Sequence, residues 1–170
     1  PIYKGEALAL RALLHFDLMR LYGAPSWASA EAKAKTIPYV TKYSFDITPF
    51  SSYDQVFKYI IDDLKEAEKC LKADETLLPA VRNNSAGGFT SCRILHMNLY
   101  AVQALLARVY WYMGDLANAS IYANKVIVSE KFTFRPKERF VQADNGTLDM
   151  SETIFGIYST QSNVKNGKAF

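Results

Sequence analysis

The stretch LLARVYWYMGDLANASIYANKVI, residues 105–127, joins two helical patterns through a two-residue turn. The first pattern covers about residues 94–113 and is apolar nearly all round, which predicts a central, buried helix. Gly114 and Asp115 follow as a helix stop and a new N-cap. The second pattern, about residues 116–129, carries one apolar stripe. The stretch therefore predicts a tight antiparallel helix hairpin.

Two more helical patterns precede this hairpin. Residues 5–22 have helical periodicity and are closed by Gly23, which is a common helix stop. Residues 53–71 carry one apolar stripe and one charged face, which predicts a helix that covers a core from outside. Ser52 and Gln55 fit a capping box at its start.

The charges of the first helix lie on two sides of a helical wheel. Glu6, Asp17 and Arg20 fall together, and Arg11 and His15 lie roughly opposite. The two apolar arcs between them predict a helix packed on both sides, between its partner helix and the next helix pair. Buried charges are costly unless paired, so we expect Arg11, Asp17 or Glu6 to bridge to a neighbouring helix. Contact with a partner protein is the alternative.

These patterns predict an all-α fold of tetratricopeptide-like antiparallel helix pairs, with about four main helices. Pair one covers residues 5–71 and includes a long loop over 23–51, and pair two covers residues 94–129. The tail, residues 130–170, is expected to be irregular with a few extended segments. Residues 1–170 are interpreted as one helical-repeat domain.

Composition excludes several classes of protein. A net charge of +3 without a dense basic run gives little basis for binding nucleic acid. No stretch is long and apolar enough to predict a membrane span. The chain starts at Pro1 without a signal segment, so we interpret it as a piece of a longer protein. Cys70 and Cys92 do not form a disulfide framework or a metal-ligand spacing.

Motifs for catalysis are absent from the sequence. It has no glycine-rich phosphate loop, no zinc-binding histidine motif and no nucleophile elbow. His15 and His96 are far apart and are interpreted as structural. Asp62, Asp63 and Glu66 lie on the polar face of an amphipathic helix, which indicates a solvated surface. The sequence thus predicts a protein that is not an enzyme and has no metal or cofactor.

The long loop of pair one is the best candidate for ligand contact. It places Trp27, Tyr39 and Tyr43 among Pro, Ser and Thr residues. Aromatic rings beside polar groups suit the apolar ring faces of sugars. The alternative is that these rings hold the loop against the helices. Trp111, inside the third helix, is expected in the core.

Four segments together resemble the SusD/RagB family of nutrient-binding proteins. GEALALRALLHFDLMRLYGAP resembles the segment that usually reads as an LRA triplet, an aromatic pair, then YG and Pro. Here Leu10, Arg11 and Ala12 form the triplet, and His15 stands in place of an aromatic residue. YDQVFKYIIDDLKEAEKCL, LLARVYWYMGDLANASIYANKVI and SETIFGIYS are similar to the segments that follow, in the same order.

The resemblance implies a lipid-anchored protein of the bacterial outer membrane. Such proteins capture glycans or peptides and cover a TonB-dependent, SusC-like transporter. It therefore implies an oligosaccharide ligand, a transporter partner and membrane contact only through a lipid anchor outside this chain. A generic tetratricopeptide-like adaptor that binds a protein in its groove is the alternative function.

Overall fold

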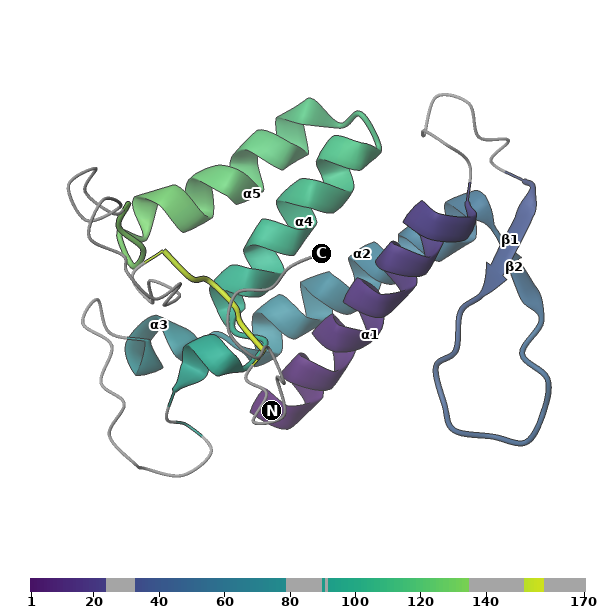
Figure 1. Ribbon diagram of the computed structural model, residues 1–170, viewed down its shortest axis with the longest axis horizontal. Helices are drawn as coiled ribbons and strands as arrows, with labels where there is room; N and C mark the ends of the chain where they lie inside the picture. The colour runs from purple at the N-terminus through teal and green to yellow at the C-terminus, as the bar shows by residue number, and fades with distance from the viewer. Residues whose placement is uncertain (24–32, 79–89, 91, 135–151, 158–170) are drawn as a thin grey trace, which may run out of the picture.

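The structure is a computed structural model that describes residues 1–23, 33–78, 90, 92–134 and 152–157. Helices make up most of these residues (Figure 1). The elements, in chain order, are α1 (Ile2–Tyr22), β1 (Lys35–Pro38), β2 (Phe50–Ser52), α2 (Tyr53–Cys70), α3 (Asp74–Leu77), the 3-10 helix η2 (Arg93–Leu95), α4 (Leu99–Tyr112) and α5 (Leu116–Val128). The predicted all-α class with two main helix pairs is confirmed.

The helices form two antiparallel pairs, α1 with α2 and α4 with α5 (Figure 1). The pairs meet where α4 packs on α2. Aromatic rings fill this junction: Phe57 stacks on Tyr112 at 5.6 Å between ring centroids, and Phe16 meets Tyr112 edge-on at 5.6 Å. Edge-on and offset stacks are the favourable arrangements of such rings. One continuous core therefore joins both pairs.

A glycine allows α1 and α2 to approach closely near the N-terminus. A Cβ atom added at Gly5 would lie 2.7 Å from Leu71 Cγ and 2.9 Å from Cys70 Cβ. Leu71 is fully buried, so the Cβ has no free space to enter. The absence of a side chain at position 5 therefore sets the distance between the two helices there.

The start of α4 differs from the predicted start at residue 94. Asn98 is the N-cap, and its Oδ1 accepts a hydrogen bond from the Ala101 N–H at 3.0 Å. The preceding residues form η2 and then an extended residue, His96. The apolar run continues through both parts, so hydrophobicity did not reveal the boundary. The capping residue Asn98 marks the start of α4.

A buried charge cluster ties the first pair to the second. The Arg93 guanidinium donates to both oxygens of Asp74 at 2.7 and 3.0 Å, and it also donates to Glu6 of α1. Asp74 Oδ2 accepts from the Leu99 N–H at 3.0 Å. Glu6 therefore forms one of the expected bridges to a neighbouring element. Each buried charge in the cluster has a partner, which offsets its loss of hydration.

The predicted two-sided packing of α1 is wrong for the described residues. One face packs on α2, but the opposite face carries a row of solvent-exposed leucines, with Leu14 exposed by 62% and Leu21 by 74%. The row consists of Leu10, Leu14, Leu18 and Leu21. The second helix pair packs mainly against α2, which leaves this face of α1 uncovered by the part of the chain that is described.

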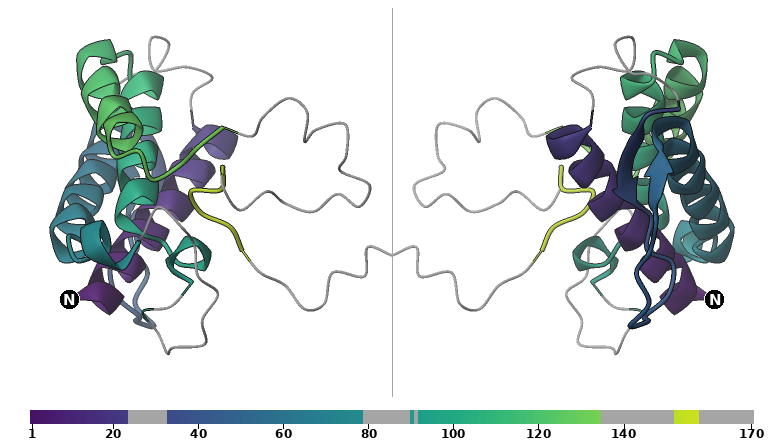
Figure 2. Two further views of the ribbon diagram at one scale, coloured as in Figure 1. Left: turned by 90° about the vertical axis from the view of Figure 1, so that its left-hand side faces the viewer. Right: turned by 90° about the vertical axis from the view of Figure 1, so that its right-hand side faces the viewer.

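The long connection between α1 and α2 contains a two-stranded antiparallel sheet that the sequence did not predict. Lys35 pairs with Ser52 and Pro38 with Phe50, with an irregularity between these pairs. The hairpin stands at one end of the α1–α2 pair (Figure 1), and this end faces the viewer in the right-hand view of Figure 2. Residues 131–134 and 152–157 of the tail have no strand, in agreement with the expected irregular tail.

Candidate functional site

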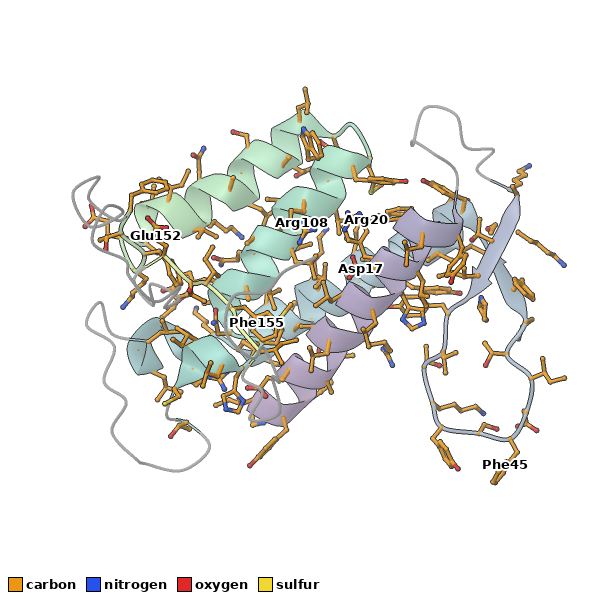
Figure 3. The ribbon with its side chains drawn as sticks, in the orientation of Figure 1. Asp17, Arg20, Phe45, Arg108, Glu152 and Phe155 are labelled. Atoms are coloured by element: carbon orange, nitrogen blue, oxygen red, sulfur yellow. The ribbon has the colours of Figure 1, made fainter. Side chains whose placement is uncertain are left out.

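An exposed loop connects β1 to β2 and extends away from the helices (Figures 1 and 3). We call residues 39–49 the aromatic loop. The Tyr43 side chain is 92% exposed and that of Phe45 is 96% exposed. Their rings meet edge-on at 5.9 Å between centroids. The exposure expected of Tyr43 is thus present in the structure.

Phe45 and Ile47 were not chosen from the sequence, although both are as exposed as Tyr43. A signal was available: Tyr43, Phe45 and Ile47 are spaced two residues apart, as on one side of an extended chain. Ser44 accepts the Asp46 N–H at 3.0 Å and donates to the Asp46 carboxylate at 2.7 Å. This local turn braces the segment that carries the rings.

Tyr39 is not the exposed ring that the sequence predicted. Its side chain is only 5% exposed, and its ring lies between His15, at 4.1 Å, and Tyr59, at 5.3 Å. The hydroxyl donates to Asp63 Oδ2 at 2.6 Å. Burial, followed by the Asp63 carboxylate, raises the pKa of Tyr39 above its usual value. Tyr39 therefore holds the loop to the helices, as the alternative interpretation proposed.

An ion pair between α1 and α2 lies beside Tyr39. Arg11 Nε donates to Asp63 Oδ2 and Nη2 donates to Oδ1, each at 2.7 Å. Nη1 donates to the carbonyl of Thr41 at 3.0 Å. The hydrogen bond to Asp63 raises the pKa of Arg11. The bridge expected of Arg11 is confirmed, and Asp63 is a partly buried partner rather than a solvated surface charge.

His15 holds the next residue of the loop. Its Nε2 accepts the Val40 N–H at 3.1 Å, and its Nδ1 lies 2.8 Å from the Arg11 carbonyl oxygen. Because the Val40 N–H can only donate, Nε2 must be unprotonated. The proton then sits on Nδ1, which donates to Arg11. We call Arg11, His15, Tyr39 and Asp63 the anchor cluster.

The aromatic loop thus combines a fixed base with exposed rings. Such rings can stack on the apolar faces of sugars, and neighbouring polar side chains can bond to hydroxyls. The third predicted contact, Trp27, lies outside the described residues. Among the described residues, no group of three or more side chains could hold a metal ion. In the same part of the chain, no helix is both long and apolar enough to span a bilayer.

A separate groove runs between α1, α4 and residues 152–157 and has a volume of about 470 Å³. Leu13 and Ala104 contribute to its apolar lining, and Arg108, Glu152 and Phe155 line it as well (Figure 3). Such a groove is the place where an adaptor of this fold would hold a peptide.

Trp111 is exposed by 69%, so its predicted place in the core is wrong. It follows Ala104 by seven residues, or about two helical turns, so it shares the face of α4 that carries Ala104. The core-facing side chains of the same helix include Leu105, Leu106 and Val109. An apolar sequence on every side of α4 therefore concealed a face that is open to solvent.

Comparison with known proteins agrees with this fold. A family model described as SusD-like, starch-binding and associating with the outer membrane matches residues 2–111. The chain belongs to the SusD-like family. The match takes in α1, the hairpin, α2 and nearly all of α4, so the anchor cluster lies within it. The resemblance drawn from the sequence motifs is confirmed.

Similar SusD-like proteins are known from several bacteria. A SusD-like protein of Formosa agariphila is 27% identical over 132 residues, which are 77% of this chain and 21% of that protein. The crystal structure of a SusD superfamily protein from Bacteroides thetaiotaomicron matches with a TM-score of 0.71 and 27% identity, covering 96% of this chain and 32% of that one. One from Bacteroides vulgatus matches with a TM-score of 0.60 and 31% identity, covering 84% and 29%. The chain spans about a fifth to a third of the length of these relatives.

Proposed function

We propose that this chain is the helical part of a non-enzymatic glycan-capture protein at the bacterial cell surface. The full protein binds oligosaccharides and passes them to a TonB-dependent, SusC-like transporter. The observation that carries the proposal is the family match over residues 2–111, whose description includes starch binding and association with the outer membrane. A lipid anchor outside this chain attaches the protein to the membrane.

Within the proposal, the helices are a scaffold and the long connection of pair one meets the ligand. Among the described residues, Tyr43 is the proposed ligand contact, because its ring is exposed and its loop is braced by the Ser44–Asp46 turn. Trp27 is proposed as a second contact in the same connection. Tyr39, which was also predicted as a contact, takes a supporting part because it anchors the loop.

Glycan binding by the full-length parent protein tests the proposal. A glycan array identifies the ligand, and calorimetry with that ligand then compares variants. Replacing Tyr43 with Ala removes one stacking ring, so we expect about tenfold weaker binding. Trp27→Ala is expected to weaken binding similarly without a large loss of stability. If Trp27→Ala strongly lowers stability, Trp27 belongs to the core.

Tyr3→Ala is the matched control, because Tyr3 is an exposed tyrosine near the opposite end of α1. Its replacement should leave affinity unchanged. The uptake proposal is rejected if the array shows no binding and deletion of the gene leaves growth on every oligosaccharide unchanged. Delivery to a transporter requires, in addition, that the parent protein co-purifies with a SusC-like partner.

The α1–α4 groove favours the second candidate function, a protein-binding adaptor. Arg108 is an exposed cation in this apolar groove, which suits a peptide with an acidic residue. The two functions predict opposite results for a pair of variants. Arg108→Glu should abolish partner binding by an adaptor and leave glycan binding unchanged. Tyr43→Ala should weaken glycan binding about tenfold and leave partner binding by an adaptor unchanged.

A further inference from the structure

We infer that His15 is a pH-sensitive latch that holds the aromatic loop at neutral pH and releases it on acidification. The loop leaves β1 at Tyr39, and the next residue, Val40, is held by the His15 imidazole. This is a regulatory property of the loop itself. Its consequence for ligand capture rests on the proposed function.

The latch depends on one protonation state of the ring. The Val40 N–H donates to Nε2 at 3.1 Å, so Nε2 must present its lone pair. A proton on Nε2 turns this acceptor into a donor and places two N–H groups against each other. Histidine is the side chain that ordinarily gains this proton between pH 5 and 8. Protonation of Nε2 therefore removes the hydrogen bond to Val40.

The charged and titratable groups around His15 come from α1, α2 and the aromatic loop. Arg11, one helical turn earlier on α1, is a cation, so a charged His15 adds a like charge to the same helix face. Asp63 of α2 is the nearby anion, but both its oxygens already accept hydrogen bonds from Arg11 and one also accepts from Tyr39. Tyr59 of α2 meets the ring of Tyr39 in a tilted contact. No uncommitted carboxylate of the cluster remains to stabilise an imidazolium.

Release of Val40 weakens the other attachments of the loop. The Tyr39 ring meets the same imidazole in a tilted contact at 4.1 Å between centroids, and Arg11 donates to the carbonyl of Thr41 at 3.0 Å. The three attachments lie on consecutive residues, so they act on one short piece of backbone. An imidazolium that moves away from Val40 therefore disturbs its neighbours on both sides. The exposed rings of Tyr43 and Phe45 then lose their fixed base.

Hydrogen exchange at the Val40 amide of the full-length parent protein tests the latch directly. The measured rates at pH 7.5 and pH 5.0 are divided by the rates of an unstructured peptide, which gives protection factors. We expect protection at Val40 to fall about tenfold at pH 5.0, because proton binding favours the released loop. Amides in the middle of α2 should keep their protection.

Two substitutions at the same position separate the roles of the ring nitrogens. His15→Gln places an amide oxygen near the position of Nε2 and has no proton to gain, so Val40 should be equally protected at both pH values. His15→Asn reaches only the position of Nδ1, so Val40 should be unprotected at both. His96→Gln is the control, since His96 is the other histidine of this chain and lies beside Glu6.

The loss of protection must also follow the protonation of His15 itself, read from its imidazole NMR signals. The latch is rejected if the two midpoints differ, or if His15→Gln shows the same loss at pH 5.0 as the unaltered protein. Glycan affinity, measured in parallel, separates the two proposals. A pH-dependent Val40 without glycan binding rejects the proposed function alone, and glycan binding with a pH-independent Val40 rejects the latch alone.

Discussion

Arg11 of α1 and Asp63 of α2 form a two-pronged ion pair, with both hydrogen bonds at 2.7 Å. The same guanidinium holds the Thr41 carbonyl, and the same carboxylate accepts the Tyr39 hydroxyl. The pair therefore joins the two helices of the first repeat and the base of the aromatic loop at one point. Paired forks of this kind fix geometry as well as charge.

Replacing Asp63 with Asn should lower the free energy of unfolding by about 2 kcal/mol, because it leaves the partly buried Arg11 without its anion. Asp62→Asn is the matched control on the same helix, since Asp62 pairs with Lys58 at the exposed surface. Its cost should stay below about 0.5 kcal/mol. Urea denaturation of both variants gives the comparison. Equal losses would show that the partial burial of Asp63 and its pairing with Arg11 do not matter.

Replacing Gly5 with Ala should destabilise the protein by about 1–3 kcal/mol, although alanine is the better helix former. The new Cβ would lie 2.7 Å from Leu71 Cγ, in a packed contact between α1 and α2. Adding Leu71→Ala makes room for it. The double variant should therefore lose less stability than the sum of the single losses. Additive losses in thermal or urea unfolding would contradict the proposed contact.

Replacing Leu14 with Ala should change stability by less than about 0.5 kcal/mol, because its side chain is largely exposed in the described structure. Leu64→Ala, at a fully buried position, should cost about 3 kcal/mol. The free energy of unfolding of both variants is measured on this chain of residues 1–170, not on the full-length parent protein. A large loss at Leu14 would mean that the outer face of α1 is covered in solution.

Replacing Tyr39 with Phe should cost about 1 kcal/mol at neutral pH, because one hydrogen bond to Asp63 is lost and Arg11 still satisfies that carboxylate. Burial raises the pKa of Tyr39, so the folded state favours the protonated phenol. The contribution of the hydroxyl is therefore full below pH 10, the ordinary tyrosine value, and declines above it. Urea unfolding at pH 8 and pH 11 should show the difference between the two proteins shrinking. An unchanged difference would contradict the role of Tyr39 as donor.

The main helices could be predicted from the sequence because local signals mark where helices begin and end. Ser52 and Gln55 form the predicted capping box, and Asp115 caps α5 by accepting the Asn118 N–H at 3.1 Å. Gly114 has the positive φ of 80° that a glycine stop favours. These caps and the glycine stop act within a few residues, so they can be recognised without knowledge of the tertiary structure.

The features that the sequence did not reveal depend on distant partners. Asp63 has the same local pattern as Asp62, and only the position of Arg11, 52 residues earlier, makes it a partly buried ion-pair partner. Tyr39 and Tyr43 have similar polar surroundings in sequence, yet Asp63 and His15 bury one of them. Trp111 could not be separated from its apolar neighbours by periodicity. In each case, the tertiary structure decides whether the side chain is buried or exposed.

The helices hold Val40 and Thr41 through main-chain atoms, namely the Val40 N–H and the Thr41 carbonyl. Every residue type except proline offers the first of these groups, and every type offers the second. Side chains at residues 42–49 are therefore free to change without loss of those two bonds. Under the proposed function, exchanging this short stretch of sequence would change the ligand preference while the helices that support it stay constant.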